Sequence, residues 1–382
     1  MNTSTPLHQE IAIIGGGIGG LATAAALGQF GVAATVYERD PMSATGGAGI
    51  TLWANAGRAL EFLGLLPGAL RCGSRIKGME LRDPSGQVIS RTGLAGFGGD
   101  PLCIARADLI GLLESRIPSA GLRRDAVLQS IETCAGGYRL VFHDGTEARH
   151  PAVIGADGLH SQVRAWLHQS RPPRYAGHVC WRGLAPLKTE PGMFFETWGA
   201  GRRFGMAPCG EGRAYWYATL NAPAGLQPDD HRGELRRLFR GWHDPVAAAI
   251  EATEDILFHE IYDRQPLASW GRGACTLLGD AAHPTTPNLG QGGGLALEDA
   301  VVLARCLGAF PDPAVAFRRY EDRRRDRTND AVNLSARLGR MAQLGIPILW
   351  KLRNRMMAAM PSSGFRRRIK PLHCYDPATV II

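Results

Sequence analysis

Apolar positions follow a regular order at the start of the chain. Ile11–Ile14 is an uninterrupted apolar run, Leu21–Phe30 is rich in Ala and Leu, and Val32–Tyr37 is a second apolar run with β-branched residues. A glycine-rich segment, Gly15–Gly20, joins the first run to the Ala/Leu segment. This order predicts a strand, a tight turn, a helix and a second strand, as at the start of a Rossmann-type sheet.

The rest of the chain continues the mixture of strand and helix patterns. Further helices are predicted over Ala54–Leu66 (ending at Pro67), Ile104–Ile117, Leu295 to about Leu307, Pro313–Leu344 and from near Pro347. Further strands are predicted over Ile76–Leu81, Val88–Ser90, Val127–Glu132, Tyr138–Phe142, Pro151–Ala156 and Cys275–Leu278, with a hairpin turn at Asp83–Gly86 and a Gly/Ala loop at Gly46–Ile50. The fold class is therefore α/β, with α+β character.

Aromatic residues gather between Tyr175 and Tyr262, on short strand-like runs separated by Gly and Pro. This pattern predicts a mostly antiparallel sheet. The aromatic side chains either build the core of that sheet or form a wall for a flat ligand.

The glycine-rich segment contains G-x-G-x-x-G as Gly15, Gly17 and Gly20, and Glu38 follows eighteen residues after Gly20. In such a segment the first glycine permits a tight turn, the second lets the backbone approach a pyrophosphate, and the third lets helix and strand pack closely. An acidic residue at the end of the second strand can accept the ribose hydroxyl protons. The spacing predicts a dinucleotide site; the alternative is an ordinary structural turn.

Composition excludes several classes of protein. The 382 residues carry 43 Lys and Arg against 35 Asp and Glu, a formal charge of +8, but the Arg are scattered apart from Arg323–Arg327 and Arg366–Lys370. We expect a basic surface with ion pairs and no nucleic-acid partner. No apolar stretch is long enough to span a membrane, and Met1–Glu10 does not resemble a signal peptide, so a cytoplasmic protein is expected. The closest two of the eight cysteines are 29 residues apart, which favours reduced thiols and no metal site.

Three separated segments carry a family resemblance: Gly15–Gly20 with Glu38, Val153–Arg164 with its Asp157-Gly158 pair, and Gly279-Asp280 with the glycines that follow. Together they resemble the class A FAD-dependent aromatic monooxygenases, typified by para-hydroxybenzoate hydroxylase. The second segment is similar to that family's "DG" motif and the third to its "GD" motif. The resemblance covers nearly the whole chain.

The resemblance implies a noncovalent FAD, with Glu38 at the adenosine ribose, Arg39 near the adenine and Asp280 at the ribityl chain. Asp157 either links the FAD and nicotinamide-nucleotide sites, as in the family, or caps the helix that starts near Ser161. The residues implied in FAD binding are Gly15, Gly17, Gly19, Gly20, Glu38, Arg39, Gly49, Arg106, Leu128, Asp157, Gly279, Asp280, Gly290, Gly292 and Gly293.

The family's architecture also implies the domain organisation. Residues 1–70, 100–174 and 265–345 would form a discontinuous, Rossmann-type FAD-binding domain. Residues 71–99 and 175–264 would form an inserted substrate domain, and residues 346–382 a C-terminal helical segment. The C-terminal segment, with Pro347–Met360 and the basic Arg366–Lys370, is either an interfacial membrane anchor or a helix packed on the body with a basic end.

The family's chemistry implies that NAD(P)H reduces FAD, that O2 adds at the flavin C4a, and that the hydroperoxide hydroxylates an electron-rich ring. Because the chain has only one G-x-G-x-x-G, NAD(P)H is expected to bind transiently, without its own Rossmann domain. The partners expected are therefore a small planar aromatic or heteroaromatic substrate and O2, with the chain a monomer or a homodimer. The alternative is an FAD-binding redox module without hydroxylase turnover.

Two subgroups are similar in more detail. Segments such as Gly47–Leu52 and Thr286–Gly292 resemble 2-heptyl-4-quinolone 3-monooxygenases, although zeaxanthin epoxidases share the second. FAD-dependent urate hydroxylases share Tyr175–Gly177, Arg203 and Tyr215, but normally carry Asp where this chain has Asn288.

Three residues of the aromatic segment are candidates for catalysis. Arg203 could stabilise a substrate oxyanion, unless it is a surface arginine. Tyr215 and Tyr217 are two apart in a predicted strand and so share a face, where either could orient a ring hydroxyl. Arg182 and His283 are weaker candidates, and no general base is assigned.

Overall fold

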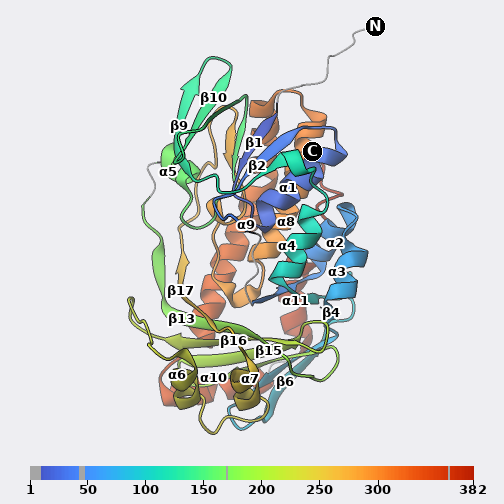
Figure 1. The fold of residues 1–382 in the computed structure, drawn as a ribbon. Coiled ribbons are helices and arrows are strands. Elements are labelled where there is room, and N and C mark those ends of the chain that lie inside the picture. Colours follow the sequence, from blue (N-terminus) through green and yellow to red (C-terminus); the bar gives the residue numbers. More distant parts are fainter. Residues whose placement is uncertain (1–9, 43–47, 169–170, 360–361) are drawn as a thin grey trace.

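A five-stranded parallel sheet forms one end of the molecule (Figure 1). The computed structural model describes residues 10–42, 48–168, 171–359 and 362–382, so Met1–Gln9 and the start of the predicted Gly46–Ile50 loop lie outside the described residues. The strand order is β18-β12-β1-β2-β8, and every neighbouring pair is parallel. The strands are β1 (Ile11–Ile14), β2 (Ala34–Tyr37), β8 (Leu122–Arg123), β12 (Val153–Gly155) and β18 (Cys275–Leu277). The predicted Rossmann-type opening is confirmed.

Three main helices stack beside this sheet: α1 (Ile18–Gln29), α8 (Gly292–Ala309) and α9 (Pro313–Ala342). α1 packs on the sheet, α8 on α1 and α9 on α8. Small and aliphatic side chains dominate α1 and α8, which allows this close packing, whereas α9 also carries many charged residues. α1 and α8 are buried along most of their length, and α1 contributes four buried alanines. A Cβ atom at Gly20 would lie 1.9 Å from the carbonyl oxygen of Gly15, so glycine is required where α1 leaves the β1 turn.

A seven-stranded sheet lies at the other end of the molecule (Figure 1). Its order is β17-β13-β16-β15-β14-β5-β6, and all pairs are antiparallel except β14 with β5. The strands are β5 (Gly78–Arg82), β6 (Val88–Gly93), β13 (Arg174–Ala185), β14 (Met193–Trp198), β15 (Arg202–Pro208), β16 (Ala214–Asn221) and β17 (Leu257–Asp263). Two segments far apart in the sequence thus share one sheet; the domain boundaries expected above stay a prediction.

The aromatic residues of this sheet divide between its two faces. Trp181, Phe204 and Trp216 are fully buried in a cluster with α6 (His231–Leu238) and α7 (Val246–Ala252). For these three, the expectation that aromatic residues build the sheet core is confirmed. Tyr215 and Tyr217 alternate with Trp216 along β16 and so belong to the opposite face.

Two small sheets and several helices complete the fold. The sheets are β3-β7-β4 (Gly49–Leu52, Leu102–Ala105, Ser74–Arg75) and β11-β10-β9 (Glu147–His150, Gly137–Phe142, Leu128–Cys134). The remaining helices are α2 (Ala54–Phe62), α3 (Leu66–Cys72), α4 (Arg106–Glu114), α5 (Gln162–His168), α10 (Pro347–Ala359) and α11 (Ser362–His373), with 3₁₀ turns at Ser119–Gly121, Gly279–Ala281 and Pro287–Leu289.

Two predicted helices were wrong in their bounds. The helix expected over Ala54–Leu66 is two helices: α2 ends at Phe62, and Pro67 lies in the first turn of α3. Proline fits a first helical turn because the N–H group it lacks has no intrahelical partner there. The helix expected from Ile104 begins at Arg106, because Leu102–Ala105 pairs with β3 as a buried strand. Short apolar runs do not distinguish a buried strand from a helix.

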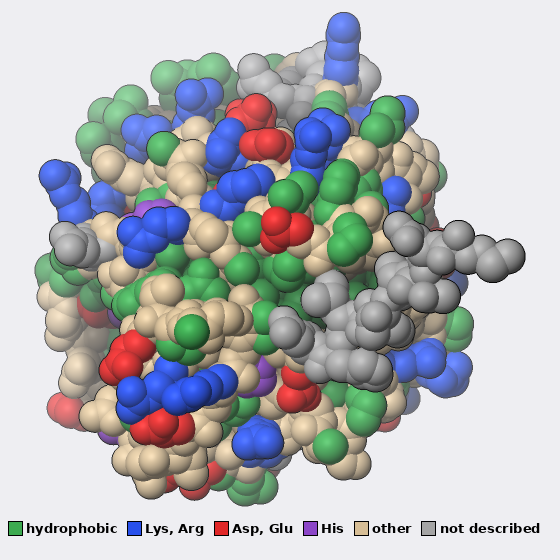
Figure 2. Space-filling view, turned by 90° about the horizontal axis from the view of Figure 1, so that it is seen from above, with side chains coloured by type: hydrophobic (Ala, Val, Ile, Leu, Met, Phe, Trp, Pro, Cys, Tyr) green, Lys and Arg blue, Asp and Glu red, His purple; other side chains and the backbone are tan. Residues whose placement is uncertain are grey.

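Positive and negative side chains are mixed on the face of the molecule at the parallel-sheet end (Figure 2). Figure 2 shows the parallel-sheet end from above, with Lys and Arg side chains standing among Asp, Glu and apolar side chains. Within the ranges that the structure describes, no helix is long and apolar enough to cross a membrane, and no group of His, Cys, Asp and Glu could hold a metal ion. All eight cysteines are free thiols.

Candidate active site

A groove runs along the carboxyl ends of β1, β2 and β12, the edge at which α/β sheets bind ligands. It brings together many of the residues predicted to bind a dinucleotide. Those on its wall are Gly15, Gly17, Glu38, Arg39, Arg106, Leu128 and Asp157.

The glycine turn at the base of this groove is shaped for a phosphate. Gly15 has a φ of +107°, and a Cβ atom there would lie 2.5 Å from the carbonyl oxygen of Ala156. A Cβ atom at Gly17 would meet nothing within 4 Å, so the backbone there borders open space. No side chain caps the start of α1 at Gly17, which leaves its first-turn N–H groups available to an anion.

Glu38 is fixed at the end of β2 by the glycine turn. Its Oε2 atom accepts a hydrogen bond from the Gly16 N–H group, and its Oε1 atom accepts one from the Asp40 N–H group at 2.9 Å. An ionised carboxylate has about four acceptor positions, so Glu38 can also accept from ribose hydroxyls.

Both oxygens of Asp157 are engaged at the start of α5. Oδ2 accepts from the N–H groups of Gln162 at 2.7 Å and Val163 at 3.2 Å, and Oδ1 accepts from the Ser161 hydroxyl. Burial raises the pKa of this carboxyl group. Of the two alternatives from the sequence, helix capping is the one these contacts show; a link between nucleotide sites stays a prediction.

A second group of charges includes Arg106 and Asp280, which lie within electrostatic range of one another. Both side chains are accessible to solvent, and Arg106 also lines the groove. Desolvation raises the pKa of Asp280, against the opposing charges of His283, Arg106 and Arg182. Arg182, a weaker candidate from the sequence, therefore lies within charge range of Asp280.

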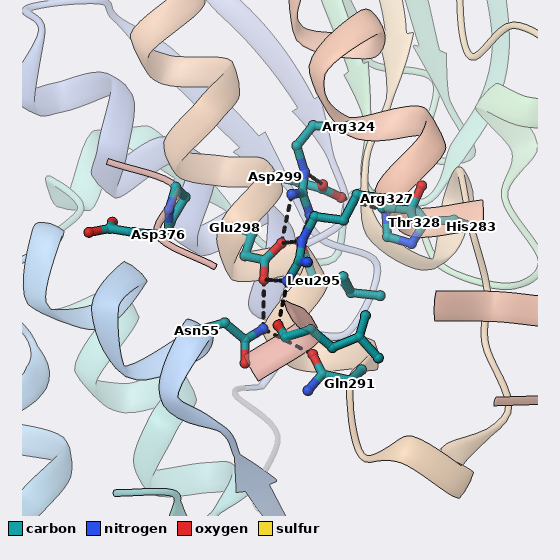
Figure 3. A network of polar contacts seen from close by, with 12 residues as sticks. Asn55, His283, Gln291, Leu295, Glu298, Asp299, Arg324, Arg327, Thr328 and Asp376 are labelled. Carbon is teal, nitrogen blue, oxygen red and sulfur yellow. Dashed lines mark hydrogen bonds and ion pairs between the residues drawn. The ribbon is translucent and has the colours of Figure 1, made fainter. Parts of the chain in front are cut away.

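The Gly279-Asp280 loop is held by contacts to α8 and α5. Asp299 of α8 accepts from the Gly279 N–H group at 3.1 Å, and its Oδ2 atom lies 2.6 Å from Nε2 of His283 (Figure 3). Arg164 of α5 donates to the carbonyl oxygens of Ala281 and Ala282, both at 3.0 Å. His283 is thus a buried partner of Asp299, and no contact among the described residues makes it a base.

Asp299 is the centre of a fully buried charge network. Its Oδ1 atom accepts from Nε of Arg324 at 2.6 Å, and Arg324 also pairs with Glu298 at 2.6 Å (Figure 3). Burial alone would raise the pKa of Asp299, but His283 and Arg324 lower it to about 2. The carboxylate stays ionised and holds the loop beside Asp280.

Glu298 extends this network to the second glycine-rich loop. It accepts from Nδ2 of Asn55 at 2.6 Å, and the same nitrogen donates to Oε1 of Gln291 at 2.9 Å (Figure 3). Nε2 of Gln291 and Oδ1 of Asn55 are buried and have no partner in the described structure. Such unpaired polar atoms beside a glycine loop indicate a place for a polar ligand.

The glycines of this loop allow close packing at the start of α8. Gly290 has a φ of +60°, and a Cβ atom there would lie 3.1 Å from Nε1 of Trp53. A Cβ atom at Gly293 would lie 2.6 Å from Ile50. The open turn at Gly17 in the groove, and the unpaired polar atoms of Asn55 and Gln291 beside this second loop, fit the two halves of FAD.

Tyr215 and Tyr217 lie side by side on the face of the long sheet that is opposite Trp216. Their ring centroids are 6.2 Å apart. A Cβ atom at Gly49 would lie 2.4 Å from the Tyr215 ring, so β3 approaches this face closely. Burial raises the pKa of both tyrosines, and Glu196 raises that of Tyr217 further. The structure brings the two rings together as the sequence predicts; their role in catalysis is untested.

Arg203 is buried, with 3% of its surface exposed, so the alternative of a surface arginine is wrong. It donates to Glu196 at 3.1 Å, to Asn288 at 2.7 Å and to Gln343 at 3.2 Å. Its charge is therefore balanced by Glu196, and its orientation is fixed from three sides.

Several of these residues were not found from the sequence. Glu298 and Asp299 are adjacent carboxylates inside a largely apolar helix, and this pattern in the sequence indicates a buried charge pair. Glu196 and Gln343 carried no signal, because only the tertiary structure brings them to Arg203.

The parallel sheet carries a phosphate-binding turn and a second glycine-rich loop suited to FAD, and an aromatic sheet is attached to it. This combination defines a flavoprotein monooxygenase fold. Residues 8–335 match the FAD-binding domain family, and the chain belongs to it. The family resemblance stated from the sequence, and FAD as cofactor, are confirmed.

Similar proteins cover nearly the whole chain. It is 38% identical over 369 residues to the aurachin C monooxygenase/isomerase of Stigmatella aurantiaca, covering 94% of this chain and 96% of that protein. It is 37% identical over 333 residues to a Klebsiella pneumoniae FAD-dependent urate hydroxylase, covering 84% and 87%. The structure superposes on Klebsiella pneumoniae HpxO complexed with FAD and uric acid with a TM-score of 0.89 and 32% identity, covering 99% and 98%.

Proposed function

We propose that this FAD-dependent monooxygenase uses NAD(P)H to hydroxylate a planar aromatic or heteroaromatic substrate. The observation that carries the proposal is the position of Tyr215. The Tyr215 ring lies against Gly49 of β3 and within electrostatic range of Arg182. Arg182 also lies within electrostatic range of Asp280, which is predicted to bind FAD. From these neighbours we infer that the aromatic face of the long sheet borders the flavin end of the FAD site.

The residues of the chain have separate roles in this proposal. Gly15–Gly17 and Glu38 bind the adenosine half of FAD, and Asp280 with the loop Gly290–Gly293 binds the flavin half. When bound and reduced, FAD supplies the activated oxygen derived from O2. Tyr215 and Tyr217 stack with the substrate ring and orient it.

Arg203 is proposed to donate a hydrogen bond to a ring oxygen of the substrate. Negative charge on that oxygen makes the ring more nucleophilic, and a fixed donor stabilises it without reorganisation. Glu196 and Asn288 hold the guanidinium in place. Because Glu196 already balances the charge of Arg203, a substrate oxygen with only partial negative charge suits the site.

The site can be compared with two classes of substrate, urate and the alkylquinolones. Asn288 is an amide that donates to Thr286 at 2.9 Å, where urate hydroxylases normally have a carboxylate. Tyr215 also packs with an apolar cluster that includes Trp53 and Phe97. These features favour a ring with an apolar edge, as in alkylquinolones, over urate, whose perimeter is polar.

The test is an assay of the purified, yellow protein. NADH and NADPH oxidation are measured with and without alkylquinolones, urate and hydroxybenzoates, and products are identified by mass spectrometry. Stimulated oxidation with a product heavier by one oxygen supports the proposal. A flavin-loaded protein that no aromatic compound stimulates would favour the alternative, a redox module. A cytoplasmic location and a monomeric or dimeric state stay predictions.

A further inference from the structure

α10 presents an apolar face to solvent at the end of the molecule remote from the parallel sheet (Figure 1). Ile348, Leu349, Leu352 and Met356 are 79%, 42%, 52% and 62% exposed. At about 100° per residue, these four side chains lie within one arc of about 100° on the helix. Single exposed apolar residues are common, but a contiguous helical stripe indicates a binding surface.

The opposite side of α10 is fixed to the body of the protein. Arg353 is buried, lies over the ring of Trp198 at 4.7 Å and donates to the carbonyl oxygen of Ala342 at 2.8 Å. Asn354, the next residue, is also buried, and α10 contacts β6. The helix is thus anchored by one side, and its apolar arc faces outward.

The apolar arc is flanked by positive charge. Lys351 and Arg355, one turn apart, are exposed beside it. Between Gln343 and Tyr375 the chain carries seven Lys and Arg and no Asp or Glu. The exposed side of α10, with Lys351 and Arg355 beside the apolar arc, is therefore cationic and amphipathic.

The positive charge beside the apolar arc favours an anionic partner for this surface of α10. A second copy of the chain, related by a twofold axis, would bring the same cations against each other. An anionic lipid surface pairs with them and accepts the aliphatic arc between its headgroups, the arrangement of helices that lie in a membrane interface. We propose that α10 docks this protein on an anionic lipid bilayer, lying parallel to its surface. This proposal does not depend on the substrate.

The test is sedimentation of the FAD-loaded, full-length protein with vesicles. We expect it to pellet with phosphatidylcholine vesicles that contain phosphatidylglycerol at low salt, and much less with phosphatidylcholine alone. Binding should fall in about 0.5 M salt, where the Debye length is only a few Å. The triple variant Ile348→Ser, Leu352→Ser, Met356→Ser should weaken binding at least about tenfold, since each side chain loses its burial in the interface.

Charge variants and controls separate the two contributions. Lys351→Glu with Arg355→Glu should also release the protein, because each cation near an anionic surface contributes about fivefold in affinity. Val315→Ser and Lys188→Glu change an exposed apolar residue and an exposed lysine elsewhere and should bind as the unchanged protein does. The flavin spectrum of each variant shows that it is folded.

Three outcomes would overturn the proposal. The first is no pelleting with anionic vesicles at low salt. The second is pelleting that the α10 variants do not reduce. The third is a concentration-dependent dimer, in sedimentation velocity, that the triple serine variant dissociates, since α10 would then be the interface between two copies.

Discussion

Arg203 shows how the role of one side chain depends on its neighbours. It is buried and held by Glu196, Asn288 and Gln343, and none of these three residues lines the predicted FAD groove. We expect Arg203→Ala to retain the flavin spectrum while kcat/KM for substrate-stimulated NAD(P)H oxidation falls about 10- to 150-fold, the loss of one charge-assisted hydrogen bond.

Glu196→Gln is the informative companion, because it removes the balancing charge and leaves the guanidinium free for a substrate oxyanion. It should lower KM for anionic substrates. Unchanged kcat/KM in both variants would place the substrate elsewhere.

Asp280 offers the corresponding test for the cofactor. It lies within electrostatic range of Arg106, and its carboxylate is expected to accept a ribityl hydroxyl proton. Asp280→Ala should weaken FAD binding about 5- to 150-fold, as expected for one unpaired hydroxyl worth about 1–3 kcal/mol. Asp280→Asn, which keeps an acceptor, should lose less. Flavin fluorescence titration of deflavinated protein measures both, and equal affinity in all three proteins would make Asp280 purely structural.

The C-terminal helix α11 ends in a buried histidine that couples its packing to pH. His373 packs against Trp53, with ring centroids 4.0 Å apart and the rings tilted by 30°, and neither ring nitrogen has a partner in the described structure. Burial, and to a smaller extent Arg327, lowers the pKa of His373 to about 3. Unfolded histidine titrates near 6.5, so between these two values the unfolded chain binds more protons and the folded protein loses stability as pH falls.

The resulting expectation concerns stability between pH 7.5 and pH 5. His373 should lower the free energy of unfolding by about 2 kcal/mol between pH 7.5 and pH 5. His373→Phe, which keeps an aromatic ring against Trp53, should remove that part of the pH dependence. Urea unfolding at the two pH values measures it. His143→Phe, at an exposed position, is the control. An identical pH dependence in wild type and His373→Phe would contradict the buried placement of α11.

In the molecule as a whole, Arg324 joins parts that are distant in sequence. It pairs with Glu298 and Asp299 of α8, and its guanidinium lies 5.2 Å from the ring of Tyr375 in the C-terminal tail. Arg324→Met leaves two buried carboxylates with fewer partners and should lower the free energy of unfolding by about 3–5 kcal/mol. FAD affinity should fall too, since Asp299 holds the Gly279 loop.

Arg323→Met is the matched control, because the preceding residue is exposed on the same helix. It should change the free energy of unfolding by less than about 0.5 kcal/mol. Chemical denaturation of the FAD-loaded proteins measures both changes. Equal stability of the two variants would show that the network contributes nothing beyond packing.

The order of the first strand, turn, helix and second strand follows from the sequence alone, and the position of the glycine turn in the groove follows from that order. Gly15, Gly20 and Glu38 could be assigned because their requirements are local: a positive φ, a close backbone approach, and an acid at the end of a strand. The alternation of Tyr215 and Tyr217 about Trp216 is equally local, because side chains of a strand alternate between faces.

The tertiary structure is needed to know which face of the long sheet packs against β3 and which partners hold Arg203. Glu196 lies 7 residues from Arg203 in the chain, but Gln343 lies 140 residues away. The tertiary structure also decided that Leu102–Ala105 is a strand, since pairing with β3 outweighed the helical pattern. Burial and charge pairing are sums over neighbours that the fold brings together, and the spacing of residues along the chain does not contain them.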